Sequence, residues 1–76
     1  MAAKQYRDQQ YLIQLGERIK AIRESNGWTQ EHFAEICNID IRQLGRIERA
    51  ETNSTISILK MIADKLRLPL HELFKF

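Results

Sequence analysis

Residue types that form strands, turns and crosslinks are scarce in this chain of 76 residues. One proline, three glycines and the absence of valine argue against a β-rich fold, since sheets favour β-branched residues and glycine- or proline-containing turns. The single cysteine, Cys37, cannot form an internal disulfide, so we expect a reducing cytoplasm. No apolar run approaches the ~20 residues that cross a bilayer, and the start, Met1 to Gln10, is too polar for a secretory signal. These absences predict a cytoplasmic protein without membrane contact.

The composition indicates one folded domain with a modest core. Hydrophobic residues make up 43% of the chain and charged residues 29%, which is too apolar for a disordered chain. The formal net charge is only +2. A protein that coats DNA without sequence preference would carry more positive charge, whereas a sequence-specific DNA-binding protein needs only a few well-placed cations. Charge alone therefore does not identify a partner.

Side chains that carry catalysis or bind metals form no recognisable set in the sequence. His32 and His71 lie far apart, and neither has a cysteine or carboxylate at metal-ligand spacing. No nucleophile–base–acid set or phosphate-binding glycine loop occurs. Cys37 is interpreted as a core residue, with a redox-sensing thiol as the alternative. The sequence thus predicts no enzyme, no metal, no cofactor and no small-molecule ligand.

Apolar residues recur with helical spacing after a polar lead-in over residues 1–10. The first helix carries an apolar stripe formed by Leu12, Leu15, Ile19 and Ile22. It should end at Ser25-Asn26-Gly27, a sequence typical of a helix stop. Gly16 lies beside the stripe, where another helix could approach closely.

Two short helices follow, separated by a tight break. Thr29 is a suitable N-cap for a second helix over Gln30 to Cys37. Asp40 is a suitable N-cap for a third helix over Ile41 to Arg49, and Gln43 three residues later completes a capping-box pattern. A connection this short between two helices is typical of a helix-turn-helix.

The third helix has an apolar side and a basic side. At ~3.6 residues per turn, its apolar residues and its arginines face opposite ways. The two sets are Ile41, Leu44 and Ile47, and Arg42, Arg46 and Arg49. Guanidinium groups suit bidentate contacts with phosphate or with the N7/O6 edge of guanine. The pattern fits either a helix that reads DNA or an ordinary solvated basic face. The helix-turn-helix context favours a helix that reads DNA, because a major groove ~12 Å wide admits one α-helix.

The C-terminal part of the chain predicts two more helices. Ser54 or Thr55 caps a fourth helix, and Pro69 precedes a last short helix over Leu70 to Phe76. A small domain rarely has room to bury all the apolar residues found here, so the surplus predicts a two-fold interface. The predicted interface residues are Ile58, Met61, Leu70, Leu73 and Phe76. Such a homodimer would present two reading helices ~34 Å apart to an inverted repeat in double-stranded DNA.

From Leu15 to Phe74 the chain resembles the Cro/phage-repressor type of helix-turn-helix, also called the XRE family. It is most similar to the small bacterial transcriptional regulators and restriction-modification controller proteins of that family. The motifs that carry the resemblance are TQEHFA at the start of the second helix, IER near the end of the third, an Asn four residues later, and the ending LPLHELF. The chain departs from the pattern at Asn38, where the turn usually has glycine, although Asn tolerates the left-handed conformation. The resemblance implies an all-α, five-helix lambda-repressor-like DNA-binding domain over residues 11–76, with its helix-turn-helix at helices two and three.

The resemblance also implies roles for individual residues. Residues that match positions facing base edges are Asp40, Ile41, Arg42 and Arg46. Residues that match phosphate contacts are Gln30, Gln43, Arg49, Asn53, Ser54 and Thr55. Base contacts set sequence preference, whereas phosphate contacts set register and affinity. Asp40 has two interpretations, a helix cap or an acceptor for cytosine.

One charged pair is better explained by folding than by DNA binding. Arg23 falls within the apolar stripe of the first helix, and Glu48 falls on the inner side of the third. Either charge alone would be costly to bury, so the two are expected to form a structural ion pair.

These observations predict a sequence-specific, homodimeric transcriptional regulator of a bacterium or phage that occupies a DNA operator. The operator's position relative to a promoter would decide between repression and activation. The alternative is an antitoxin-like interaction module that sequesters a partner protein through its apolar C-terminal surface.

Overall fold

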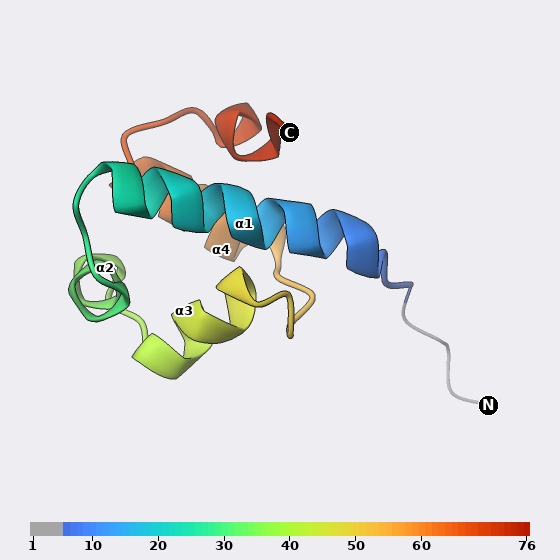
Figure 1. The fold of residues 1–76 in the computed structure, drawn as a ribbon, viewed down its shortest axis with the longest axis horizontal. Coiled ribbons are helices and arrows are strands. Elements are labelled where there is room, and N and C mark those ends of the chain that lie inside the picture. Colours follow the sequence, from blue (N-terminus) through green and yellow to red (C-terminus); the bar gives the residue numbers. More distant parts are fainter. Residues whose placement is uncertain (1–5) are drawn as a thin grey trace.

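The computed structural model describes residues 6–76 and shows an all-helical fold (Figure 1). Its elements are α1 (Gln9–Ser25), α2 (Gln30–Cys37), α3 (Ile41–Glu48), α4 (Ile56–Lys65) and a 3-10 helix, η1 (Leu70–Phe74). No strand occurs within residues 6–76. Residues 1–5 of the predicted polar lead-in lie outside the described residues, and its last two residues, Gln9 and Gln10, belong to α1.

The prediction of a fifth α-helix is wrong, because the last element is a 3-10 helix of 5 residues. A segment this short cannot offset the cost of nucleating an α-helix, and 3-10 geometry is usual for such short pieces. Pro69 precedes it in an extended conformation. Within η1, Leu73 is fully buried in the core. Leu73 therefore cannot belong to the exposed dimer interface predicted from the sequence, and that assignment is also wrong.

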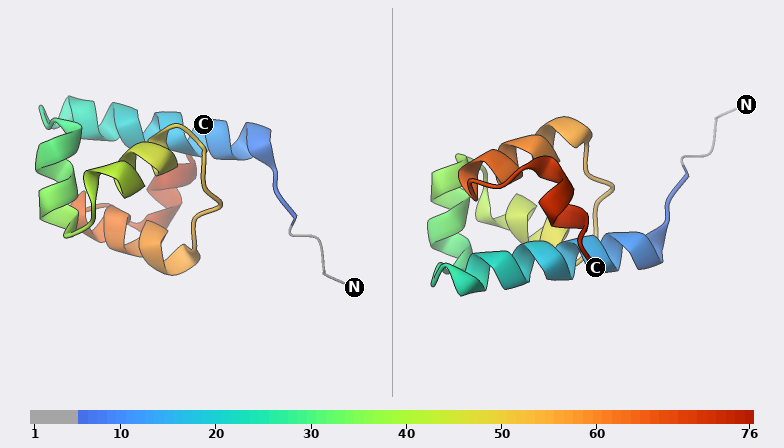
Figure 2. Two further views of the ribbon diagram at one scale, coloured as in Figure 1. Left: turned by 90° about the horizontal axis from the view of Figure 1, so that it is seen from below. Right: turned by 90° about the horizontal axis from the view of Figure 1, so that it is seen from above.

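The helices are arranged around the long helix α1. Figure 2 shows α1 and α4 along opposite edges of the domain, with α3 between them on one face, η1 between them on the other, and α2 crossing one end. The helix α3 packs against α1 and α2, and η1 packs against α1 and α4. The surface formed by α3 and the surface formed by η1 therefore lie on opposite faces of the domain.

None of the helices in the described part of the chain is both long enough and apolar enough to cross a membrane.

Every element contributes one large, fully buried side chain to a single core. These side chains are Ile19, Phe33, Leu44, Ile62 and Leu73, from α1, α2, α3, α4 and η1 in turn. Burying a side chain of this size stabilises a fold by about 1.5–3 kcal/mol relative to leaving it exposed. The core therefore depends on all five elements, and α3 is anchored to it through its apolar side.

Side-chain caps fix where each α-helix begins. The N-caps are Asp8, Thr29, Asp40 and Thr55, so Thr55 rather than Ser54 caps α4. The Asp40 carboxylate accepts a hydrogen bond from the Arg42 backbone N–H at 2.7 Å. The Gln43 N–H donates to the Asp40 backbone carbonyl at 2.9 Å instead. Asp40 thus caps α3 as predicted, but through Arg42 rather than through a capping box with Gln43.

Several helices end at residues in the left-handed backbone region. Asn38, which closes the turn between α2 and α3, has φ 56° and ψ 43°. Its side chain can occupy this region at lower cost than most residues, as the sequence indicates. Ala50 after α3 and Arg67 after α4 have φ values of 60° and 59°. The helix α1 ends with Asn26 as its C-cap, and Gly27 follows with φ 74°.

Gly16 brings the backbones of α1 and α3 into direct contact. A Cβ atom built at this position would lie 2.5 Å from the Glu48 carbonyl oxygen and 2.8 Å from that of Ile47. No side chain fits there without moving one helix away from the other. The close approach expected from the sequence is therefore present, and it fixes the end of α3 against α1.

Cys37 is expected to be chemically unreactive in the folded protein. The residue is buried in the core, and this burial raises the pKa of its thiol to about 11. Because the thiolate is the reactive form, a disulfide reagent such as 5,5′-dithiobis(2-nitrobenzoate) at pH 8 should modify the native protein far more slowly than the urea-unfolded protein. Equal rates in the two states would contradict the assignment of Cys37 as a core residue.

Candidate nucleic-acid interface

An open groove of about 570 Å³ runs between α3, the loop that follows it and the start of α4. The residues that line it are Asp40, Arg42, Gln43, Arg46, Ile47, Thr52, Asn53, Ser54, Thr55 and Ile58. The fold thus gathers three of the predicted base-contact residues with four of the predicted phosphate-contact residues. The other predicted contacts, Ile41, Gln30 and Arg49, lie outside this groove. Thr52 belongs to the groove without having been predicted.

The helix α3 presents its basic side to solvent. Leu44 and Ile47 are buried, whereas Arg42, Arg46 and Arg49 are exposed. Ile41, at the start of the helix, is also an exposed apolar side chain. The expected separation of apolar and basic sides is therefore present for Leu44 and Ile47, whereas the expectation that Ile41 belongs to the buried side is wrong. Guanidinium groups on such a surface are available to an anionic or hydrogen-bonding partner.

Two of the three arginines, Arg42 within α3 and Arg49 at its C-cap, form ion pairs with nearby carboxylates. Arg42 pairs with Asp40 at 3.0 Å, and Arg49 pairs with Glu51 at 2.8 Å. The hydrogen bond from Arg42 lowers the pKa of Asp40 to about 2, so this carboxylate is ionised at neutral pH. Arg46 has no ion-pair partner within residues 6–76. Two of the three positive charges on this surface are thus locally balanced by a carboxylate.

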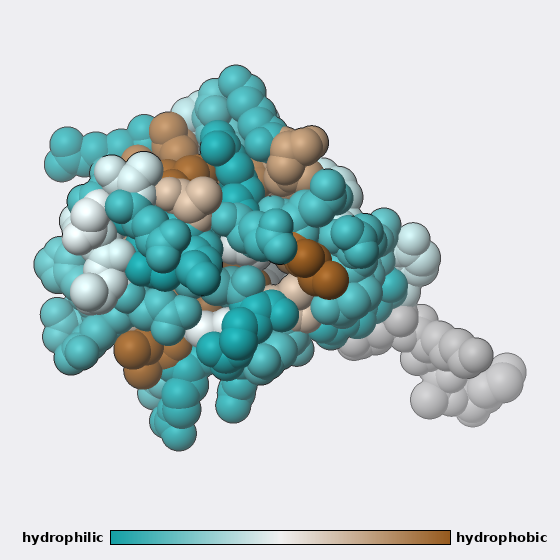
Figure 3. Space-filling view, in the orientation of Figure 1, coloured by the Kyte–Doolittle hydropathy of each residue, from teal (hydrophilic) through white to brown (hydrophobic). Residues whose placement is uncertain are grey.

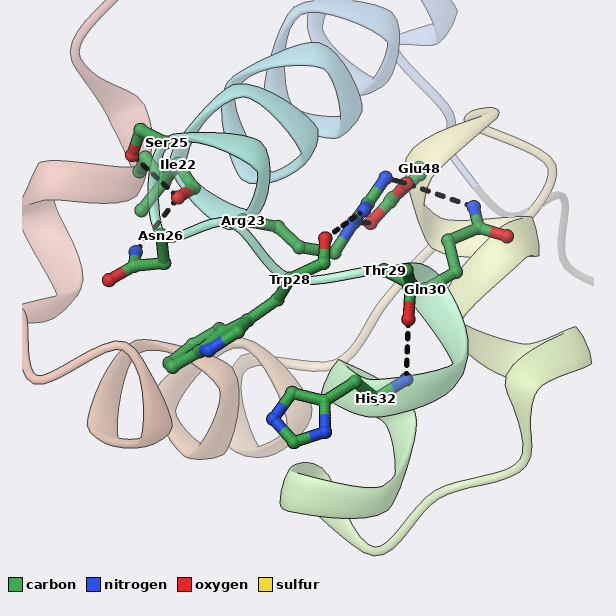
Figure 4. A network of polar contacts seen from close by, with 9 residues as sticks. All are labelled: Ile22, Arg23, Ser25, Asn26, Trp28, Thr29, Gln30, His32 and Glu48. Carbon is green, nitrogen blue, oxygen red and sulfur yellow. Dashed lines mark hydrogen bonds and ion pairs between the residues drawn. The ribbon is translucent and has the colours of Figure 1, made fainter.

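A buried ion pair joins α1 to α3 beneath this surface (Figure 4). The Arg23 guanidinium donates from Nε to one carboxylate oxygen of Glu48 at 2.8 Å and from Nη2 to the other at 3.1 Å. It also donates from Nη1 to the Trp28 carbonyl oxygen at 2.6 Å. The hydrogen bond with Glu48 raises the pKa of Arg23. The pair expected from the sequence is present, with a backbone partner that the sequence did not indicate.

Gln30 also belongs to this network. Its side-chain amide donates to the Glu48 carboxylate at 2.9 Å, as Figure 4 shows. This contact connects the first residue of α2 to the end of α3. With one amide N–H engaged by Glu48, the second amide N–H and the backbone at the start of α2 are left for the predicted phosphate contact of Gln30.

The segment before α1 and the first residue of α1 hold the loop after α3, a contact that sequence reasoning missed. The Arg7 guanidinium and the Gln9 amide both donate to the Ala50 carbonyl oxygen, at 2.6 and 2.9 Å. The Asn53 amide donates to the Tyr6 carbonyl oxygen at 3.2 Å. These residues are separated by more than forty positions, so no local pattern could indicate the contact. It fixes the path of the loop that carries the predicted phosphate contacts.

The structure places the remaining predicted interface residues at the surface or close to it. Ile58, Met61 and Leu70 are half-buried against the core, and Ile58 also lines the groove. Phe76 is exposed and meets the Tyr11 ring edge to face, with centroids 5.0 Å apart. On the face shown in Figure 3, apolar residues form small patches separated by hydrophilic ones. The apolar surface is thus divided rather than continuous on that face.

Each of the two histidines has a neighbouring side chain. His32 packs edge to face on Trp28, and His71 lies 3.8 Å from Glu72. Within residues 6–76, no group of three or more His, Cys, Asp or Glu side chains could hold a metal ion.

The fold and the groove together define a helix-turn-helix domain, in which α2 is the supporting helix and α3 is the exposed second helix. Comparison with known proteins agrees. The model of the helix-turn-helix family HTH_3 matches residues 19–73. The HTH-type transcriptional regulator YazB of Bacillus subtilis is 40% identical over 58 residues, which are 76% of this chain and 84% of that protein. The control protein C.SmaI of Serratia marcescens is 36% identical over 52 residues, which are 68% of this chain and 62% of that protein.

Solved structures show the same arrangement. The restriction-modification controller protein C.AhdI from Aeromonas hydrophila has a TM-score of 0.80 at 28% identity, over 83% of this chain and 96% of that chain. The chain belongs to the HTH_3 family of helix-turn-helix transcriptional regulators. The resemblance noted from the sequence is confirmed. The named relatives are transcriptional regulators and controller proteins, and no enzyme family is indicated.

Proposed function

We propose that this protein is a sequence-specific transcriptional regulator that binds an inverted-repeat operator as a homodimer. The observation that carries the proposal is the groove beside α3, where exposed arginines lie next to a row of small polar side chains. In this proposal α3 enters the major groove, and Asp40, Ile41, Arg42 and Arg46 face base edges. Gln30, Gln43, Arg49, Asn53, Ser54 and Thr55 hold the phosphate backbone.

The proposed dimer uses apolar residues of α4 and of the C-terminal segment. Ile58, Met61, Leu70 and Phe76 remain candidates, because their side chains are exposed or half-buried. A two-fold axis through this surface would repeat α3 on the partner and give two half-sites about 34 Å apart. The operator would then be a short inverted repeat.

Selection of bound sequences from random duplexes, at a stated salt concentration, tests DNA binding and symmetry together. An enriched inverted repeat is expected. A single enriched half-site would contradict the dimer, and the absence of any enriched sequence would contradict sequence-specific binding.

Alanine at Arg42 or Arg46 should weaken binding to the selected operator. A bidentate contact with guanine contributes ~1–3 kcal/mol, so each substitution should raise the dissociation constant roughly 5- to 150-fold, measured by fluorescence anisotropy. Lys20→Ala is the matched control, because it removes an exposed cation of α1 that does not line the groove. Wild-type affinity in the Arg42→Ala, Arg46→Ala double variant would favour the sequestering alternative.

A further inference from the structure

We propose that Asp40 is a positioning residue that holds the Arg42 guanidinium ready for a guanine edge and so sets discrimination at one base pair of each half-site. This inference rests on the proposed function and assigns a mechanism to one of its residues. It differs from both earlier interpretations of Asp40, because the carboxylate acts through Arg42 rather than only capping the helix or touching cytosine itself.

The geometry shows a carboxylate that is itself fixed. One Asp40 oxygen accepts the Arg42 backbone N–H at 2.7 Å and the Arg42 Nε–H at 3.1 Å. The other oxygen accepts from Arg42 Nη2 at 3.0 Å. The backbone contact belongs to the N-cap of α3, so the position of the carboxylate is set by the helix. The guanidinium is therefore held by two bonds to an anchored partner, although 80% of the Arg42 side chain is exposed.

The contact leaves the correct edge of the guanidinium free. Asp40 occupies the Nε–Nη2 edge, while the Nη1–Nη2 edge keeps a pair of parallel N–H donors. Two parallel donors match the N7 and O6 acceptors of guanine in the major groove. A long side chain that is ordered before binding loses less conformational entropy when it binds, which strengthens the correct contact selectively.

The electrostatics supply an independent reason for this role. A carboxylate on a DNA-facing surface is repelled by phosphates, so Asp40 lowers affinity for every sequence unless it is paired. Asp40 and Arg42 both line the groove. Because Asp40 is paired with Arg42, we expect its cost to nonspecific affinity to be small beside its effect on discrimination by Arg42.

The chain contains a matched pair for comparison. Arg49 and Glu51 have the same two-residue spacing and a similar contact, with Nε–Oε2 at 2.8 Å. Neither residue lines the groove. Glu51→Gln therefore removes one negative charge near DNA without touching the arginine at the proposed guanine contact.

The test compares Asp40→Ser and Glu51→Gln with the wild-type protein. Serine retains the N-cap but is too short to reach the guanidinium fork. Binding is measured by fluorescence anisotropy on the selected operator and on duplexes with each base pair changed in turn. Asp40→Ser should reduce discrimination roughly 2- to 12-fold at the base pair that Arg42→Ala also affects, as expected for the lost ordering of one long side chain. Glu51→Gln should raise affinity for all duplexes alike and leave discrimination unchanged.

A double variant separates positioning from other roles. In an Arg42→Ala background, Asp40→Ser should cause no further loss of discrimination, because the two residues act as one unit. Three results would overturn the proposal: discrimination lost at a different base pair, which assigns a direct cytosine contact; a uniform gain of affinity like that of Glu51→Gln, which assigns charge alone; and unchanged binding. If the wild-type protein itself shows no sequence preference, it is the proposed function that fails.

Discussion

Replacing Glu48 with alanine is expected to destabilise the fold by about 3–5 kcal/mol, because the substitution leaves a buried guanidinium without its partner. The Arg23 and Glu48 side chains are only 7% and 2% exposed. Arg23 would keep its bond to the Trp28 carbonyl but would lose both carboxylate contacts. The Gln30 amide would lose its partner as well. A loss of this size is comparable to the whole stability of many small domains.

Urea unfolding followed by circular dichroism and by Trp28 fluorescence measures this effect. Glu35→Ala, at an exposed position of α2, should change the free energy of unfolding by no more than about 0.5 kcal/mol. If Glu48→Ala does not fold, the double variant Arg23→Met, Glu48→Met tests whether the unpaired buried charge is the cause, because removing both charges should restore folding. A Glu48→Ala protein as stable as the wild type would show that the pair contributes little.

Alanine at Gly16 should destabilise the protein by about 1–3 kcal/mol or more, as expected for overpacking. The added methyl group would lie 2.5 Å from a backbone carbonyl oxygen of α3. This oxygen cannot move without shifting the end of the helix. We therefore expect a lower stability together with a small displacement of α3 relative to α1.

Gly45 provides a matched control within the same helix pair. The three atoms nearest to a Cβ atom at Gly45 all belong to the end of the Arg49 side chain, the closest at 2.7 Å. This flexible group can move aside, and alanine favours the helix by ~1 kcal/mol over glycine. Thermal unfolding should thus show a lower midpoint for Gly16→Ala and an equal or higher one for Gly45→Ala, with ~4–8 °C expected per kcal/mol. Equal destabilisation by both substitutions would contradict the assigned contact.

Most of the fold could be predicted because its signals are local. Caps such as Thr29 and Asp40 lie next to the helices that they begin, and the two sides of α3 follow from its own residues. The η1 segment shows where this reasoning fails. Its apolar residues indicate burial but not the partner, so Leu73 could be assigned equally well to an interface or to the core, and the tertiary packing decided.

The sequence predicted most of the residues that line the candidate groove but not the contacts that they make. Arginine spacing identifies the basic side of α3, whereas the pairing of Arg42 with Asp40 depends on side-chain rotamers. The bonds from Arg7 and Gln9 to the Ala50 carbonyl join distant parts of the chain and leave no periodic signal. Short-range patterns therefore indicate which side chains α3 exposes, and the three-dimensional arrangement determines how each group is oriented.

The non-glycine residues with positive φ also bear on how this protein could acquire new specificities. Asn38, Ala50 and Arg67 each hold a backbone conformation that glycine adopts at lower cost. Arg67 is exposed and does not line the α3 groove. A glycine there would add stability of about 1 kcal/mol without altering the groove beside α3. Such a margin of stability would let the protein tolerate destabilising substitutions in α3, the helix that we propose to read DNA.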